Sequence, residues 1–579
     1  MISVENLSYS FPQKDLYNNI SFTLEEGQHC AFIGSNGTGK STLIDLIMHP
    51  EKYLFDGKLE KSPNCKIGYV SQFLALDETK DMTVFEFIAE EFIKLQNEMT
   101  SLCAEMETSS EIETLLEQYQ NALDSFDAID GNDFESNITK KLNLANLNRH
   151  ENLMLSQLSG GEFKLIQVIK AMLVNPDLLI MDEPDVFLDF ERLNALRELI
   201  NSHKGVMLVI THNRYLLNHC FNKIIHLENM ELQEFNGRYI DYNFALLQRK
   251  IELQEQVVAE DEEIERNKKI VDKMRFDATY YYCTTRGRAL HARVSHLERL
   301  EARKIKEPFV DIKQPQINLY SDNVMEDTIA LKVHDYSVSF DDTLLEHVDF
   351  EIKSTDKVAL IGPNGTGKTT LLRDIFENYH NSIEINEGIQ VAFLSQLQGE
   401  MLNESNTIMD EFLAAGFKTY DDIKSHLKNY GFEDEILHQK IGALSGGEKN
   451  LLQLAKIATS NANLLLLDEP TSHLDTYSQI ALESAIANYN GAILMVSHDF
   501  YTIANCVDYV LIIEDQAIRK MSTRKFRKMI YENHFDKDYL ENEQKKKEIE
   551  TKIALALQDK NFELAKDLSE KLEELIKVL

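Results

Sequence analysis

The sequence predicts an α/β protein with two similar domains in tandem, joined by an α-helical linker and followed by a helical C-terminal extension. Three observations predict this fold class. A glycine-rich loop between an apolar strand and an apolar helix occurs twice in the chain. Further short motifs follow each loop in the same order. Long stretches with apolar residues at helical spacing separate and follow the two copies.

The composition disfavours several classes of protein. The 579 residues are too many for one hydrophobic core, and a hydrophobic content of 43 % is ordinary for a globular protein. No signal segment follows Met1, and no apolar run approaches the ~20 residues of a membrane helix. The six cysteines are scattered without a C-x-x-C pair, which disfavours zinc and disulfides and indicates a cytoplasmic protein. The net charge of −36 disfavours nucleic-acid binding by the chain as a whole, although such an average can hide a local basic element.

Each glycine-rich loop fits the phosphate-binding pattern G-x-x-x-x-G-K-[ST]. Its glycines allow several backbone N–H groups to converge on phosphate oxygens, and the following helix N-terminus adds positive potential. The flanking strand and helix, found twice, disfavour an ordinary glycine-rich turn. We expect Lys40 and Lys368 to reach the β- and γ-phosphates and Ser41 and Thr369 to ligate Mg²⁺. The expected nucleotide contacts are Gly34, Ser35, Asn36, Gly37, Thr38, Gly39, Lys40, Ser41 and Thr42 in the first loop and Gly362, Pro363, Asn364, Gly365, Thr366, Gly367, Lys368, Thr369 and Thr370 in the second.

Four further motifs occur in both halves of the chain. They are Tyr69-Val-Ser-Gln72 and Phe393-Leu-Ser-Gln396, Leu158-Ser-Gly-Gly-Glu162 and Leu444-Ser-Gly-Gly-Glu448, Leu178-Leu-Ile-Met-Asp-Glu-Pro184 and Leu464-Leu-Leu-Leu-Asp-Glu-Pro470, and the strands that end at His212 and His498. A buried carboxylate at a strand end, such as Asp182 or Asp468, can hold Mg²⁺ through water. Phe11 and Phe340 lie in matching strand-rich leads, where an aromatic ring can either stack on adenine or pack in the core.

Together these motifs resemble those of a tandem ATP-binding-cassette (ABC) ATPase. The resemblance implies two tandem ABC-type P-loop ATPase domains, which we call the first and second cassettes. In that family the Ser-Gly-Gly segment of one cassette covers the ATP held by the other, and a hydroxyl with N–H groups at a helix start suits such anion binding. The implied contacts are Ser159, Gly160, Gly161 and Glu162 for the nucleotide on Lys368, and Ser445, Gly446, Gly447 and Glu448 for the nucleotide on Lys40.

The resemblance also implies catalytic and metal-binding roles. Glu183 and Glu469 would polarise the attacking water, and His212 and His498 would contact the γ-phosphate. A lone histidine is more often structural, but the strand-end position and the repeat favour a functional role here. The implied Mg²⁺ ligands are Ser41, Gln72 and Asp182 in the first cassette and Thr369, Gln396 and Asp468 in the second.

One motif differs between the cassettes. The second cassette has Pro470-Thr-Ser-His-Leu-Asp475, which is close to the usual family sequence, whereas the first has Pro184-Asp-Val-Phe-Leu-Asp189. Asp185, Val186 and Phe187 thus replace a polar segment that normally touches the opposite cassette. Because both glutamates and both histidines are kept, we expect both sites to hydrolyse ATP, but not equally.

The spacing of the motifs locates the remaining segments. The offset between copies falls from 324 at Gln72 and Gln396 to 286 at Leu158 and Leu444, so about 38 extra residues lie in the first half. Apolar residues at helical spacing predict a helical arm there, at about 88–128. The C-terminal segment reads as a helical hairpin, with Ile549 and Ile553 before the turn at residues 559–561 and Leu564, Leu568, Leu572, Leu575 and Leu579 after it. The expected domains are 1–237, 238–325, 326–530 and 531–579.

The linker, 238–325, has a local charge opposite to that of the chain. An apolar stripe at coiled-coil spacing predicts two antiparallel helices with a tip near residues 277–287. From Ile264 to Lys306 there are 12 Lys/Arg and 5 Asp/Glu, a net charge of +7. A solvated helix face with a packed tyrosine cluster would explain such a run, but the reversal of sign favours RNA contact. The expected RNA contacts are Tyr280, Tyr281, Tyr282, Arg286, Arg288, His291 and Arg293.

Two cassettes without a membrane segment, an arm and a basic helical linker resemble the ABC-F ATPases. This resemblance implies a cytoplasmic monomer, with ATP and Mg²⁺ as cofactors, that binds the E site of the 70S ribosome in its ATP-bound closed form. Its partners would be 23S rRNA, P-site tRNA and proteins near the E site, and its linker would reach toward the peptidyl-transferase centre.

Two sequence segments resemble one branch of this family in particular. Residues 182–190, with Thr211-His-Asn-Arg-Tyr215 after them, look most like the OptrA/PoxtA type of the antibiotic-resistance branch. That type implies displacement of ribosome-bound antibiotics. The alternatives are a housekeeping ABC-F translation factor and, in a different class, a transporter's tandem ATPase subunit, which would not need the basic linker.

Overall fold

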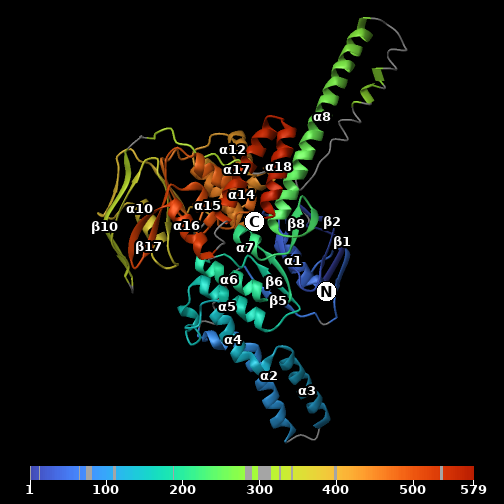
Figure 1. Ribbon diagram of the computed structural model, residues 1–579, viewed down its shortest axis with the longest axis vertical. Helices are drawn as coiled ribbons and strands as arrows, with labels where there is room; N and C mark the ends of the chain where they lie inside the picture. The colour runs from blue at the N-terminus through green and yellow to red at the C-terminus, as the bar shows by residue number, and fades with distance from the viewer. Residues whose placement is uncertain are drawn as a thin grey trace. The chain divides into compact units, whose positions relative to one another are not determined.

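The structure is a computed structural model, shown in Figure 1. It describes residues 2–11, 14–63, 65–72, 81–107, 112–186, 188–280, 290–291, 293–295, 297, 315–324, 328–340, 343–396, 399, 401–534 and 539–578. The chain forms two compact units. The first comprises Met1–Arg238 and Lys313–Arg527 and contains both cassettes, and the second comprises Tyr239–Ile312 and Lys528–Leu579.

In the described residues, the first cassette is built around a six-stranded sheet with the order β5-β6-β7-β3-β8-β9. Its strands are β3 (His29–Ile33), β5 (Ile67–Val70), β6 (Leu178–Asp182), β7 (Val206–Ile210), β8 (Lys223–Glu228) and β9 (Glu231–Asn236). All neighbouring strands are parallel except the β8–β9 hairpin. Every residue of β6, β7 and β8 is buried, as expected for parallel strands that are covered on both faces.

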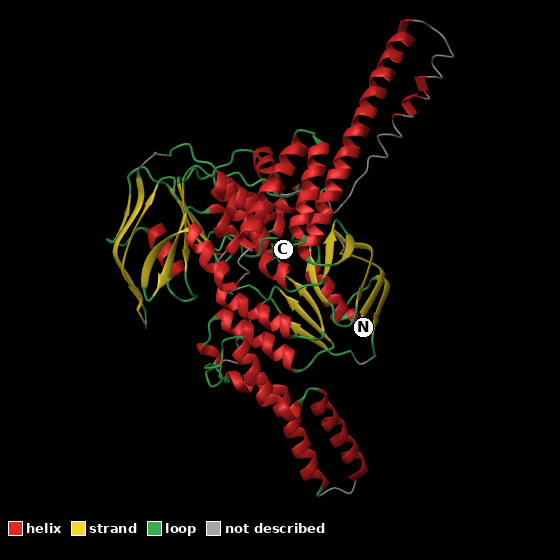
Figure 2. Cartoon of the chain, in the orientation of Figure 1, coloured by secondary structure: helices red, strands yellow, loops and turns green. Residues whose placement is uncertain are grey.

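A smaller antiparallel sheet and several helices complete the first cassette (Figure 2). The sheet has the order β2-β1-β4, and its core includes Ile2, Val4, Leu7 and Phe22. Its strands are β1 (Ile2–Phe11), β2 (Lys14–Leu24) and β4 (Asp56–Lys61). The helices are α1 (Lys40–Met48), α4 (Phe134–Leu144), α5 (Gly160–Leu173), α6 (Phe190–Ser202) and α7 (Arg214–His219).

The second cassette repeats this topology, with the sheet orders β14-β15-β16-β12-β17-β18 and β11-β10-β13. Its strands are β10 (Ile329–Ser339), β11 (Thr343–Lys353), β12 (Lys357–Ile361), β13 (Ile383–Ile385), β14 (Val391–Leu394), β15 (Leu464–Asp468), β16 (Ala492–Val496), β17 (Tyr509–Glu514) and β18 (Ala517–Ser522). Its helices are α10 (Lys368–Glu377), α11 (Ile408–Ala414), α12 (Tyr420–Lys428), α13 (Gly446–Ile457), α14 (Thr476–Asn488), α15 (Phe500–Cys506) and α16 (Thr523–His534). The predicted fold class, α/β with two tandem ABC cassettes, is confirmed.

The extra residues of the first cassette contain two helices, α2 (Val84–Met106) and α3 (Ile112–Ala128), which lie side by side (Figure 1). A capping box at Thr83 and Glu86 starts α2, because each satisfies a backbone N–H group of the other. The base of the pair is anchored by Phe92, whose ring stacks on Phe134 of α4 with centroids 4.9 Å apart.

The second unit contains α8 (Tyr239–Tyr280), α17 (Tyr539–Gln558) and α18 (Phe562–Ile576). The base of α8 packs against α17 and α18, and Lys566 forms an ion pair with Glu255 at 2.6 Å. Of the leucines after the turn, Leu564 is exposed and Leu579 lies outside the described residues. The buried face of α18 is formed by Ala565, Leu568, Ser569, Leu572 and Ile576. Among the described residues, no helix is long and apolar enough to cross a membrane.

Candidate functional site

The first glycine-rich loop leads from β3 into α1. Gly39 has a φ of 99°, which favours glycine, and the helix begins at the next residue, Lys40. The Lys40 ammonium is buried and donates to the backbone oxygens of Gly34 (2.8 Å) and Ser35 (2.9 Å). In the second loop, Lys368 donates in the same way to Gly362 (2.8 Å) and Pro363 (2.7 Å). Each loop thus holds a cation beside a helix N-terminus, and this combination binds phosphates.

The first loop is completed by residues of the second cassette. The Asn36 backbone N–H donates to the Asp475 carboxylate at 3.0 Å, and its side-chain amide donates to the His473 carbonyl at 2.8 Å. A Cβ atom on Gly447 would lie 2.5 Å from the backbone oxygen of His473 and 1.9 Å from the Asn36 amide nitrogen, so only glycine fits at this position. The structure therefore brings the Ser445-Gly446-Gly447 segment against the loop that carries Lys40.

The second loop faces the first cassette across a cavity of about 490 Å³, within the size range of small-molecule sites. The Asn364 backbone N–H points at the Asp189 carboxylate at 3.5 Å. The predicted residues that line the cavity are Ser159, Gly160, Gly161, Glu183 and His212 of the first cassette and Asn364, Gly365, Gly367, Lys368, Thr369, Thr370, Gln396, Asp468, Glu469 and His498 of the second. Both sites are thus composite, because each combines a loop from one cassette with a Ser-Gly-Gly segment from the other.

The Ser-Gly-Gly segments begin two helices, α5 and α13. Ser159 and Ser445 are their N-caps, and each forms a capping box with the glutamate three residues later. The Glu162 carboxylate accepts the Ser159 N–H at 2.8 Å and also pairs with Arg192 at 2.7 Å. Glu448 makes the same capping contact with Ser445. The structure therefore places both glutamates at the helix N-termini, where they fix the segments that face the nucleotide loops.

The buried aspartates lie at corresponding strand ends. Asp182 ends β6 and Asp468 ends β15, and their exposed fractions are only 4 % and 1 %. Burial and the neighbouring charge of Glu183 raise the pKa of Asp182 to about 6, against the effect of a hydrogen bond with Ser41. Hydroxyl, carboxylate and amide oxygens at one place fit Mg²⁺. In the described part of the chain, no cluster of three or more His, Cys, Asp or Glu side chains is arranged to hold a metal.

The glutamates that follow have the same backbone conformation. Glu183 has a φ of 45° and Glu469 a φ of 48°, a left-handed conformation that is uncommon for residues other than glycine. Their N–H groups donate to Ile210 and Val496, both at 2.9 Å. This geometry turns both side chains out of the strand direction and into the composite sites.

The surroundings of the two carboxylates differ. Glu183 Oε2 accepts the Gln72 amide at 2.7 Å and lies 3.4 Å from His473 Nδ1 of the second cassette. Burial would raise the pKa of Glu183, but the hydrogen bond with His473 and the positive charge of Lys40 lower it overall. Burial and the charge of Asp468 instead raise the pKa of Glu469 to about 8.

The two histidines at the strand ends are nearly buried. The His498 Nε2 atom lies 3.5 Å from Glu469 Oε1, and the backbone N–H of His498 donates to Glu469 Oε2 at 3.3 Å. In the described part of the chain, His212 Nε2 is buried without a hydrogen-bond partner. Burial and the neighbouring lysines lower the pKa of both imidazoles to about 4, so both are neutral near pH 7.

Several predicted site residues lie outside the two composite sites or outside the residues that the structure describes. Phe11 and Phe340 are 46 % and 71 % exposed, so the alternative that they pack in the core is wrong. Tyr280 ends α8, and His291 and Arg293 are exposed in short helical stretches. The other predicted RNA contacts, Tyr281, Tyr282, Arg286 and Arg288, lie outside the described residues, as does Phe187.

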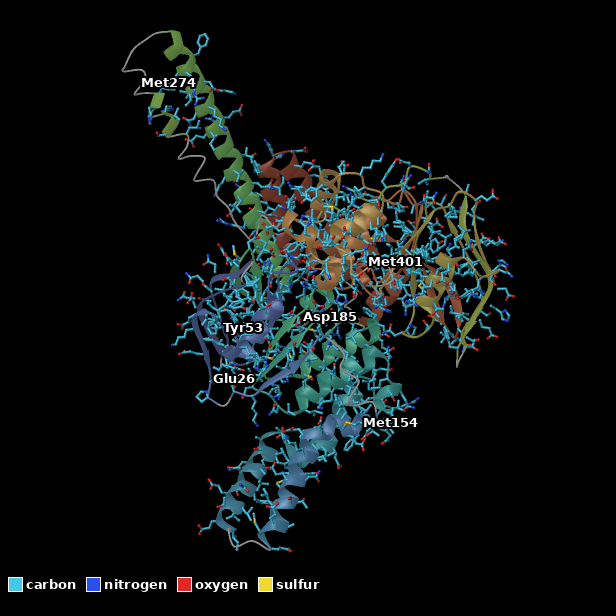
Figure 3. The ribbon with its side chains drawn as sticks, turned by 180° about the vertical axis from the view of Figure 1, so that it is seen from behind. Glu26, Tyr53, Met154, Asp185, Met274 and Met401 are labelled. Carbon is cyan, nitrogen blue, oxygen red and sulfur yellow. The ribbon has the colours of Figure 1, made fainter. Side chains whose placement is uncertain are left out.

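Three residues at the contact between the cassettes were not predicted as site residues. His473 and Asp475 lie in the motif that differs between the cassettes, and this sequence difference could have identified them as site residues. Arg214 lies two residues after His212 and pairs with Glu483 and Asp499 of the second cassette. Figure 3 labels Asp185, another residue of the differing motif, which lines the cavity and accepts a hydrogen bond from the Thr211 hydroxyl at 2.6 Å.

Two P-loops, each completed by the opposite cassette, define an ATPase of the cassette type. The family model described as ABC transporter matches residues 17–186 and 345–472, more than half of the chain. The chain therefore belongs to the ABC transporter family and is an ATP hydrolase.

The chain is similar to three curated proteins along most of its length. It is 29 % identical to the uncharacterized ABC transporter ATP-binding protein YfmM of Bacillus subtilis, over 86 % of this chain and 96 % of that protein. It is 28 % identical to ABC transporter F family member 2 of Arabidopsis thaliana, over 89 % and 76 %. It is also 28 % identical to the energy-dependent translational throttle protein EttA of Escherichia coli, over 87 % and 90 %.

Solved structures share the fold of this chain. The RNase-L Inhibitor matches with a TM-score of 0.56 and 17 % identity, covering 92 % of each chain. A structure titled as a model of ribosome-bound archaeal Pelota and ABCE1 matches with a TM-score of 0.56 and 15 % identity, covering 91 % of this chain and 80 % of that one.

Proposed function

We propose that this chain is an ABC-F-type ATPase that binds the ribosome in its ATP-bound closed form. The observation that carries the proposal is the composite construction of both sites, in which Asn36 of the first loop binds His473 and Asp475 of the second cassette. ATP in such sites stabilises the paired state of the cassettes, because each nucleotide contacts both. Similarity to an F family member and to a translational throttle protein supports translation as the process concerned.

Each group in the sites has a proposed role in ATP hydrolysis. Lys40 and Lys368 bind the β- and γ-phosphates, and Glu183 and Glu469 orient and polarise the attacking water. The neutral His212 and His498 face the γ-phosphate. The proposed Mg²⁺ ligands are Ser41, Gln72 and Asp182, and Thr369, Gln396 and Asp468. When bound, Mg²⁺ neutralises charge on the phosphate oxygens.

The remaining assignments follow from the same proposal. The protein is a cytoplasmic monomer with functional segments 1–237, 238–325, 326–530 and 531–579. It occupies the ribosomal E site, near 23S rRNA and P-site tRNA, and its linker acts at the peptidyl-transferase centre. As a member of the resistance branch, most like the OptrA/PoxtA type, it displaces ribosome-bound antibiotics, and hydrolysis releases it from the ribosome.

Ribosome sedimentation tests the central part of this proposal. The variant Glu183→Gln/Glu469→Gln keeps both phosphate loops but removes both carboxylates, so with ATP it remains closed and co-sediments with 70S ribosomes. The control Lys40→Ala/Lys368→Ala loses a phosphate-binding cation in each loop and stays in the supernatant. Equal amounts of the two variants in the ribosome pellet would contradict ATP-dependent binding.

Antibiotic susceptibility tests the resistance assignment separately. Expression of the unaltered chain raises the minimum inhibitory concentrations of phenicols and oxazolidinones. The same measurement with lincosamides and pleuromutilins defines the range of drugs that the protein counters. The variant without both glutamates gives no protection, because it does not leave the ribosome. Unchanged inhibitory concentrations together with ATP-dependent ribosome binding would favour the housekeeping translation factor, which the similarity to EttA supports.

A further inference from the structure

The two hydrolytic glutamates provide a matched comparison within one molecule. Glu183 and Glu469 follow corresponding strands, with φ values of 45° and 48° and N–H···O distances of 2.9 Å to the neighbouring strand. Differences between their side chains therefore arise from the residues around them. This inference rests on the proposed role of both glutamates in hydrolysis.

The Glu183 carboxylate is held from two sides. Gln72 of its own cassette donates to Oε2 at 2.7 Å, and His473 Nδ1 of the second cassette lies 3.4 Å from the same atom. Glu469 instead contacts only its own cassette in the described residues, through the backbone and imidazole of His498. Within that described part, no hydrogen bond joins Gln396 to Glu469. Among the described residues, the first glutamate therefore has a contact across the cassettes, and the second glutamate has none.

His473 is fixed in the position from which it reaches Glu183. Its φ of 61° is unusual for a residue other than glycine and turns the side chain toward the first cassette. Its carbonyl accepts the Asn36 amide at 2.8 Å, and its ring lies 3.1 Å from the place of a Cβ on Gly446. The same residue thus contacts the first phosphate loop, the second Ser-Gly-Gly segment and the first glutamate.

The corresponding segment of the first cassette cannot supply this contact. The residue at the position of His473 is Phe187, whose side chain has no hydrogen-bonding group. Asp189, the counterpart of Asp475, pairs with Arg192 and lies 3.5 Å from Asn364, whereas Asp475 lies 3.0 Å from Asn36.

We propose that His473 is a positioning residue that acts across the cassettes by holding the Glu183 carboxylate, and that it makes the Lys40–Glu183 site the faster of two unequal hydrolytic sites. Both contacts go to Oε2, which leaves Oε1 to accept a hydrogen bond from the attacking water. The Lys368–Glu469 site binds ATP and hydrolyses it more slowly. One cassette pair then carries a fast and a slow site.

Steady-state ATP hydrolysis in two single-site backgrounds tests this proposal. Glu469→Gln leaves the first site as the hydrolytic one, and Glu183→Gln leaves the second. In the first background, His473→Phe lowers kcat about tenfold with KM nearly unchanged, since positioning affects the chemical step more than binding. In the Glu183→Gln background, the loss of kcat on His473→Phe is several-fold smaller. Phenylalanine suits this test because the first cassette carries it at the same place.

The reciprocal change completes the experiment. In the Glu183→Gln background, Phe187→His raises kcat of the second site. When the double swap Phe187→His/His473→Phe is made in both backgrounds, the second site becomes the faster one. His347→Phe, at a 74 % exposed histidine on β11, controls for loss of an imidazole. Equal loss in both backgrounds with a raised KM would mean that His473 only stabilises the interface, and would overturn the proposal. The assay contains no ribosomes, so failure of ribosome binding would leave its result intact.

Discussion

The protonation states of the two glutamates separate the sites at the scale of single residues. Burial and Asp468 raise the pKa of Glu469 to about 8, whereas the contacts of Glu183 lower its pKa below the usual value for glutamate. Near pH 7, Glu183 is therefore ionised, while much of Glu469 carries a proton. A protonated carboxyl cannot accept the proton of an attacking water.

This difference predicts two pH profiles. In the Glu183→Gln background, kcat/KM rises as the pH increases through about 8, because ionisation of Glu469 creates the active form. In the Glu469→Gln background, the ionisation of Glu183 is complete well below pH 7, so this rise is missing. Both profiles are measured as initial rates between pH 6 and about 9, since kcat/KM reports the free enzyme. Matching profiles would contradict the difference in pKa.

At the scale of elements, α7 of the first cassette joins the two cassettes through one buried arginine. Arg214 begins α7, binds Glu483 of α14, and lies 3.0 Å from Asp499, the N-cap of α15. Its guanidinium also lies 4.8 Å from the centre of the Tyr501 ring. Phe500 stands at the corresponding place in the second cassette, so this ion cluster has no symmetric copy there.

Replacement of Arg214 should strongly destabilise the paired cassettes. Arg214→Met leaves the carboxylates of Glu483 and Asp499 without their cation in a buried setting, and breaking such a pair costs roughly 3–5 kcal/mol. The expected result is a clearly lower urea midpoint and weaker ATP hydrolysis. Arg519→Met removes an exposed arginine 3.9 Å from Glu514, and such a surface pair contributes at most about 1 kcal/mol. If both variants unfold at the same urea concentration, the cluster does not hold the cassettes together.

The sequence could predict the elements far better than the contacts between them. The phosphate loops, the apolar strands and the acidic pair at Asp182 and Glu183 are contiguous patterns, and local chemistry is sufficient to place them. The contact of His473 with Glu183 joins residues 290 positions apart, so it depends on how two folded cassettes meet. On α18, the spacing of the leucines does not identify the buried face, because Leu564 is exposed while the neighbouring Ala565 is buried.

At the scale of the whole molecule, one chain contains both halves of both sites. In the proposed function, ATP bound at either loop would contact both cassettes, and hydrolysis at either loop would remove that contact. A fast first site and a slow second site would give the paired state two stages of release. The chemistry would then set how long the protein remains on its partner.

The composite first site can be tested most directly by a substitution in the opposite cassette. In the Glu469→Gln background, Gly447→Ala should abolish hydrolysis at the Lys40 site, because the added Cβ would lie 2.5 Å from the backbone oxygen of His473 and 1.9 Å from the Asn36 amide. Gly399→Ala, where nothing lies within 4 Å of the new Cβ, controls for the change of residue and keeps the parent rate. The account predicts loss of ATP hydrolysis in the first variant alone, and an unchanged rate for Gly447→Ala would contradict it.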